Sequence, residues 1–154
     1  MPKTKAVAVK SMSKEEIQAK TGLTLIYSFL VLFATSVLVI LLANYLFPTS
    51  VVLGTHTLSF WWAVHHSMFK LAVICTFVIP LVYYHEWKRG HMYSPKEWML
   101  LYFVVNTLVI YGITRFASVL GLGIAHWWIA LLLGAALDWA QGMGMMALSK
   151  IQGQ

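Results

Sequence analysis

Charge is scarce in this sequence. Charged residues make up 10% of the 154 residues, whereas a soluble domain carries about 25%. Hydrophobic residues make up 60%. This balance predicts an integral membrane protein with one domain. The net charge of +6 does not indicate a nucleic-acid partner, because its distribution along the chain follows the predicted membrane topology.

Cysteine and catalytic motifs are also scarce. The single cysteine, Cys75, lies inside an apolar stretch, which excludes an intrachain disulfide and a cysteine-based metal site. The sequence has no glycine-rich phosphate loop, no HExxH motif and no paired carboxylates. The segments outside the apolar stretches are too short to fold as a catalytic domain. We therefore predict a protein that is not an enzyme and has neither a cofactor nor a bound metal.

Four long apolar stretches are present. Each has at least about 20 residues, enough to cross a hydrocarbon core of about 30 Å. They predict an all-α polytopic fold with four transmembrane helices in two hairpins. The predicted spans are Leu23–Phe47, Leu58–Tyr84, Trp98–Leu120 and Leu122–Met146. The transmembrane domain is then 23–148, between a basic arm at 1–22 and a tail at 149–154.

Basic residues mark one side of the membrane. Those outside the predicted spans all lie in the arm, in the loop His85–Glu97 or in the tail. The positive-inside rule predicts that both termini lie on the cytoplasmic side of a cell membrane, and the bacterial inner membrane is favoured. The arm could also bind anionic lipid headgroups, at about 1 kcal/mol per lysine, or act only as a topology signal. Its lysines are Lys3, Lys5, Lys10, Lys14 and Lys20.

Asp138 is the only formal charge in the apolar part of the last span. A carboxylate there is costly, so it is expected to have a charge partner or a functional role. A helical rise of about 1.5 Å per residue places Asp138, Lys70 and Asn106 in one layer of the bundle. This buried polar layer could be an ion pair that fixes helix packing or a relay for protons or ions. Gly134, Asp138 and Gly142 share a face at i, i+4 and i+8, which predicts close helix packing within the chain or between copies.

A second polar set lies near the predicted outer surface: His65, His66, Arg115 and His126. Histidines from two spans could hold a haem or a divalent metal. The alternative is that they are interfacial or hydrogen-bonded side chains. Adjacent His65 and His66 point about 100° apart and cannot both face one site.

Two local patterns indicate structure. Ser94, Pro95 and Glu97 are typical of a helix start, and Ser13 with Glu16 fits a capping box. Tryptophan pairs open the second and fourth spans, at Trp61–Trp62 and Trp127–Trp128, which suggests a duplicated hairpin.

The tract Val104–Leu137 resembles the hairpins of small bacterial phage-holin-like membrane proteins. These share an early asparagine, a short outer turn and an aromatic-led second helix, as at Asn106, Leu120–Ala125 and Trp127. The resemblance implies a non-enzymatic bundle that forms homo-oligomers in the lipid bilayer. The alternatives are a channel or transporter subunit that uses the polar layer, and a haem- or quinone-linked anchor that uses the histidines.

Overall fold

The computed structural model describes residues 14–151 and consists mainly of helices. Four helices are long and apolar enough to cross a membrane, so the prediction of a multi-pass helical bundle is confirmed at this level. The long helices are α1 (Lys14–Leu46), α2 (Phe60–Arg89), α3 (Pro95–Arg115) and α5 (Trp127–Ile151). The short elements are β1 (Val51–Leu53), α4 (Ala117–Leu120) and β2 (Leu122–Ile124).

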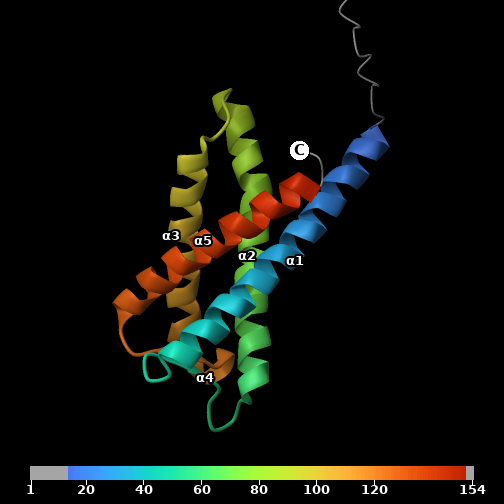
Figure 1. Cartoon of the computed structure of the whole chain (residues 1–154). Coiled ribbons are helices and arrows are strands. Elements are labelled where there is room, and N and C mark those ends of the chain that lie inside the picture. The colour runs from blue at the N-terminus through green and yellow to red at the C-terminus, as the bar shows by residue number, and fades with distance from the viewer. Residues whose placement is uncertain (1–13, 152–154) are drawn as a thin grey trace, which may run out of the picture.

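The long helices form two layers (Figure 1). Helices α2 and α3 run side by side, and α1 and α5 lie obliquely across them. Helix α1 packs on α2 and α5, and α3 packs on α5, whereas α2 and α3 contact each other less. The consecutive pairs α1–α2 and α3–α5 are thus packed neighbours. Between the layers lies a core that includes Leu32, Met68, Leu71, Ile110 and Leu137, all fully buried.

The structure adds two short strands to the predicted helices. Strands β1 and β2 pair antiparallel, with Val52 opposite Gly123. Helix α3 ends at Arg115 and the short helix α4 continues to Leu120. Because β2 occupies Leu122–Ile124, α5 begins at Trp127 rather than near Leu122. Strands of three residues are too short to show an alternating pattern in the sequence. Their pairing satisfies backbone groups where the two helix connections meet.

Gly121, which precedes β2, allows the chain to pack closely against α2. Its φ of 80° lies in the left-handed region, which favours glycine. A Cβ at this position would also overlap Ala63 of α2. The carbonyl of the preceding residue, Leu120, accepts a hydrogen bond of 2.8 Å from Ser67 Oγ.

The predicted start of the third long helix is confirmed. Ser94 caps α3, Pro95 is its first residue, and Glu97 completes a capping box with Ser94. Ser13 and the lysines Lys3, Lys5 and Lys10 lie outside the described residues, and the side chains of Lys14 and Lys20 are also outside the description.

The two halves of the chain repeat the order of their main elements. Helix, strand and helix follow one another as α1–β1–α2 and again as α3–β2–α5, with α4 inserted in the second half. The tryptophan pairs lie at the start of α2 and α5. This order agrees with the duplicated hairpin suggested by the sequence.

Candidate functional site

A chain of buried polar side chains connects all four long helices. Cys75 Sγ of α2 donates to Asn106 Oδ1 of α3 at 3.2 Å, and Asn106 Nδ2 donates to Gln141 Oε1 of α5 at 2.9 Å. Gln141 Nε2 donates to Ser36 Oγ of α1 at 3.0 Å. Ser36 Oγ in turn donates to the carbonyl of Leu32 at 2.6 Å. We call Ser36, Cys75, Asn106 and Gln141 the polar core.

The polar core follows the internal repeat. Ser36 and Asn106 precede the ends of α1 and α3 by nearly the same number of residues, and Cys75 and Gln141 follow the starts of α2 and α5 in the same way. The bond between Ser36 and Gln141 is thus equivalent to the bond between Asn106 and Cys75. The bond between Asn106 and Gln141 lies within the second half, and each of these amides also bonds to the first half, Asn106 to Cys75 and Gln141 to Ser36. The two amides therefore hold the repeats together.

A cavity of about 450 Å³ lies between the helices at the end of the bundle that carries the start of α1, the α2–α3 connection and the end of α5. We call this the basic end, because Lys88, Arg89, Lys96 and Lys150 lie there. All four long helices and the connection contribute to the cavity wall. Its polar lining residues are Thr24, Ser28, Glu86, Asp138, Gln141 and Ser149.

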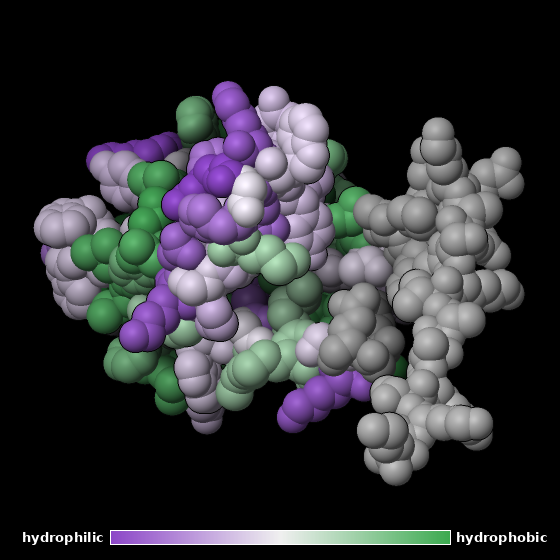
Figure 2. All heavy atoms as spheres, turned by 90° about the horizontal axis from the view of Figure 1, so that it is seen from above, coloured by the Kyte–Doolittle hydropathy of each residue, from purple (hydrophilic) through white to green (hydrophobic). Residues whose placement is uncertain are grey.

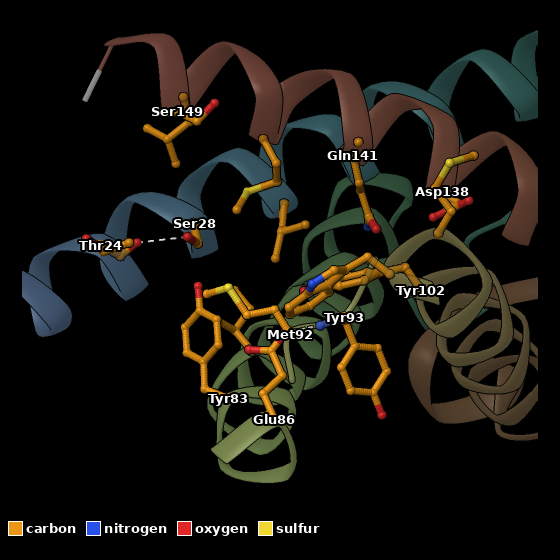
Figure 3. Close-up of a pocket in the computed structure, with 17 residues that line it drawn as sticks. Thr24, Ser28, Tyr83, Glu86, Met92, Tyr93, Tyr102, Asp138, Gln141 and Ser149 are labelled. Atoms are coloured by element: carbon orange, nitrogen blue, oxygen red, sulfur yellow. Dashed lines mark hydrogen bonds between the residues drawn. The ribbon is translucent and has the colours of Figure 1, made fainter. Parts of the chain in front are cut away.

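The cavity reaches down to the polar core. Gln141 belongs to both, and Leu32, whose carbonyl ends the hydrogen-bonded chain, also lines the cavity. Tyr102 lines it too and donates from its hydroxyl to the carbonyl of Cys75 at 3.1 Å. In the close-up, Asp138 and Gln141 come from α5, opposite Tyr83 and Glu86 of α2 (Figure 3). A solute entering from the basic end would therefore meet Asp138 and Gln141 inside the bundle.

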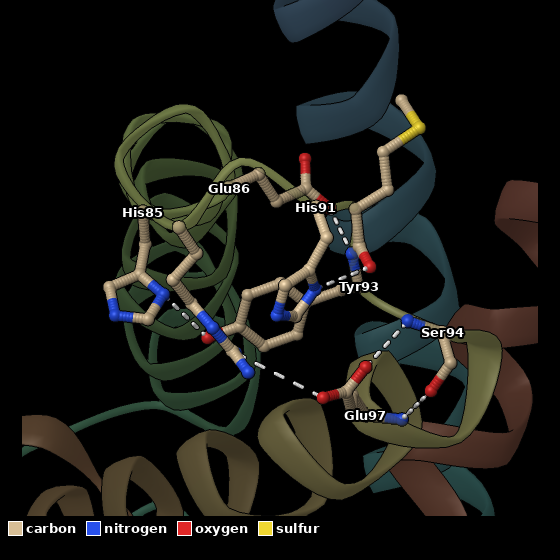
Figure 4. Close-up of polar contacts among 8 residues, drawn as sticks. His85, Glu86, His91, Tyr93, Ser94 and Glu97 are labelled. Carbon is tan, nitrogen blue, oxygen red and sulfur yellow. Dashed lines mark hydrogen bonds and ion pairs between the residues drawn. The ribbon is translucent and has the colours of Figure 1, made fainter.

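The α2–α3 connection forms a fixed edge of the cavity (Figure 4). The backbone N–H of Tyr93 donates to Glu86 Oε1 at 2.6 Å, and the Tyr93 hydroxyl lies 3.0 Å from His85 Nδ1. The Arg89 guanidinium lies 5.3 Å from the centre of the Tyr93 ring and 4.0 Å from Glu97 Oε1. These contacts hold Tyr93 at the cavity and keep the Arg89 charge with Glu97.

Comparison with protein-family models, curated proteins and solved structures gives no match. The functional argument therefore rests on the cavity and the polar core. Figure 2 looks onto the basic end and shows polar residues gathered there, beside a hollow.

The predicted buried polar layer is rearranged in the structure. Asn106 is fully buried and belongs to the polar core. Lys70 is half-buried, and its Nζ lies 2.9 Å from Nε2 of His66, one turn away on the same helix. Asp138 lines the cavity. Within residues 14–151 the recorded ion pair is Arg89–Glu97, so the structure does not bring Lys70 and Asp138 together in one chain.

The predicted outer set is dispersed. His65 Nδ1 lies 2.8 Å from the Trp61 carbonyl, His66 stacks on Trp62, and His126 stacks on Trp128. Arg115 contacts the hydroxyl and the ring of Tyr111, one turn earlier on α3. Each of these contacts joins residues close together in sequence, and none of them joins two members of the set. No group of three or more metal-ligating side chains is assembled among the described residues.

The three residues of the predicted packing face have different surroundings. Gly134 is buried, and a Cβ there would overlap the side chain of Thr107 on α3. Thr107 Oγ1 is buried and has no hydrogen-bond partner. Gly142 lines the cavity, and a Cβ there would meet nothing within 4 Å. The close approach of α5 to α1 instead occurs at Gly144, which packs against Val31 and Thr35.

Gln141 and the aromatic cavity wall were missed by sequence reasoning. Gln141 follows Asp138 by three residues and Gly134 by seven, so helical periodicity places it near the packing face. The prediction was based on the formal charge of Asp138 and did not include the uncharged amide of Gln141. The cavity itself depends on how four helices diverge, which no local pattern in the sequence reveals.

Proposed function

We propose that this chain is a multi-pass membrane protein that takes up a small amphipathic molecule in the cavity, in the manner of a channel or transporter subunit. The observation that carries the proposal is the cavity of about 450 Å³ that ends on the polar core. This volume lies within the range of small-molecule sites, which are mostly apolar with a few polar groups. The role is one of binding or passage rather than catalysis.

The basic residues support an orientation for this site. Lys88, Arg89, Lys96 and Lys150 lie at the end where the cavity opens. With both termini in the cytoplasm, as the positive-inside rule favours, the cavity opens on the cytoplasmic side of a bacterial inner membrane.

Filling the cavity tests the proposal. Gly142→Trp adds a large ring where a Cβ meets open space. Met143→Trp is the matched control, because Met143 is the next residue of α5, is exposed and is not part of the lining. The probes are tetraphenylphosphonium and triphenylphosphine oxide, and the measurement is the thermal unfolding midpoint of the purified protein in detergent.

A molecule that binds the folded state raises its unfolding midpoint. We expect at least one probe to stabilise the wild-type protein and the Met143→Trp variant, and neither to stabilise the Gly142→Trp variant. Equal stabilisation of both variants would show that the probe binds elsewhere, and the proposal would then fail.

Self-association is a second proposal, favoured by a different observation. Lys70 is half-buried on a candidate membrane span, and its recorded polar contacts in the described part of the chain are to His66 alone. A cation on such a helix is costly unless it is paired, and a second copy could supply the carboxylate. A holin-like assembly would fit this arrangement. The molecular mass of the purified protein in detergent tests it, because a monomeric mass would contradict self-association.

A further inference from the structure

The charges and rings around the cavity have a consistent chemistry. Two carboxylates, Glu86 and Asp138, lie in its wall. The described lining residues include no lysine, arginine or histidine. A bound molecule would therefore meet negative charge without a neutralising side chain in the wall.

Aromatic rings make up a large part of the same wall. Tyr83 of α2, Tyr93 of the connection, and Trp98 and Tyr102 of α3 all line the cavity. All four form a continuous group: the rings of Tyr83 and Tyr93 each lie 6.2 Å from Trp98, and Tyr102 stacks on Trp98 at 5.8 Å. The faces of such rings attract cations.

The rest of the lining suits an apolar body. Met92, Met99 and Met145 contribute flexible, polarisable side chains, and Leu32, Ile79 and Leu148 contribute aliphatic ones. Methionine-rich surfaces adapt to ligands of different shapes. The wall thus combines negative charge, ring faces and apolar surface.

We propose that the cavity binds lipophilic organic cations, such as quaternary ammonium or phosphonium compounds. Asp138 supplies the counter-charge inside the bundle, Glu86 supplies a second one near the α2–α3 connection, and the aromatic group contacts the cationic centre. Glu86 is held in place for this role, because its Oε1 accepts the hydrogen bond from the backbone of Tyr93. This inference rests on the proposed function and names the ligand class for the same site.

The basic residues at this end do not contradict the inference. Arg89 is paired with Glu97 and contacts the Tyr93 ring. Lys88, Lys96 and Lys150 are exposed and are not part of the lining. Their charges face the solution, where salt screens them.

The test compares two ions of the same shape and opposite charge, tetraphenylphosphonium and tetraphenylborate. Binding of each to the purified protein in detergent is measured by isothermal titration calorimetry. The variants are Asp138→Asn, Glu86→Gln and the control Glu97→Gln. All three remove one negative charge, but Glu97 lies outside the cavity, and glutamine preserves its capping box.

We expect the cation to bind and the anion to bind at least about tenfold more weakly. Asp138→Asn should weaken cation binding by about tenfold or more, because it removes the counter-charge. Glu86→Gln should weaken it less. Glu97→Gln should leave it within about twofold of the wild type, because the Arg89 side chain that loses this partner is exposed and its charge is screened by salt.

Other results overturn the inference in distinguishable ways. If both ions bind equally and the carboxylate variants change nothing, the cavity does not select for charge, and only the proposed uptake of amphipathic molecules survives. If neither ion binds while triphenylphosphine oxide still stabilises the wild type but not Gly142→Trp, the ligand class is wrong and the cavity remains a binding site. If none of the three probes binds, both proposals fail.

Discussion

The amide pair of the polar core gives the sharpest stability prediction. Replacing Gln141 with leucine removes its hydrogen bonds to Asn106 and Ser36, both between helices. Such bonds contribute about 0.6 kcal/mol each in membrane proteins, and at most about 1.7. The change also leaves the Asn106 amide buried without an acceptor, which costs about 1–3 kcal/mol. We expect Gln141→Leu to lower the free energy of unfolding by about 2–4 kcal/mol.

A double-mutant cycle separates the interaction between the two amides from the effect of removing a polar side chain. In Asn106→Leu/Gln141→Leu both amides are gone, so no buried amide is left unpaired, and Ser36 keeps its bond to the Leu32 carbonyl. The double variant should therefore lose less stability than the sum of the two single losses, with a coupling of about 1–3 kcal/mol.

The assay is reversible unfolding in mixed micelles with increasing dodecyl sulfate, followed by circular dichroism. Thr76→Val serves as the control, because Thr76 Oγ1 donates only within its own helix, to the Ala72 carbonyl. It should change stability by no more than about 0.5 kcal/mol. Strictly additive losses in the double variant would refute the reasoning, because the two amides would then not interact.

Three further stability predictions use residues with defined surroundings. Gly134→Ala should cost about 1–3 kcal/mol because the added methyl overlaps Thr107, whereas Gly142→Ala, which meets open space, should change unfolding by less than about 0.5 kcal/mol. Gly121→Ala should cost more than Gly90→Ala: both positions have positive φ, but only the first also overlaps Ala63. Ser94→Ala should cost about 1 kcal/mol through loss of the α3 cap, and Ser94→Asp should restore most of it; thermal unfolding in detergent measures all of these.

The long helices could be predicted from the sequence because hydrophobic length alone indicates a membrane span. The start of α3 could be predicted as well, because Ser94, Pro95 and Glu97 act locally. The β1–β2 pair could not, since it depends on two distant connections meeting at one end of the bundle.

The candidate site divides in the same way. Helical rise places Asn106 inside the bundle, and the side chain is fully buried in the structure. Its partners could not be derived, because they depend on the rotation of three other helices. Rise along a helix gives depth but not direction. This is why Lys70 and Asp138 were expected to meet, whereas the structure places one beside His66 and the other in the cavity.

The most direct test of the account is a comparison of labelling rates at two positions of α5 in inverted membrane vesicles. Gly142→Cys places a thiol in the cavity, and Trp139→Cys places one outside the lining, where the side chain is 67% exposed on a candidate membrane span. The reagent is a charged methanethiosulfonate that does not cross bilayers, and Cys75 is buried in both variants. The account predicts labelling of Gly142→Cys at least about tenfold faster than Trp139→Cys, because thiols react as thiolates, which need water. Equal rates, or labelling of Gly142→Cys only from the opposite face, would contradict a water-filled cavity that opens at the basic end to the cytoplasm.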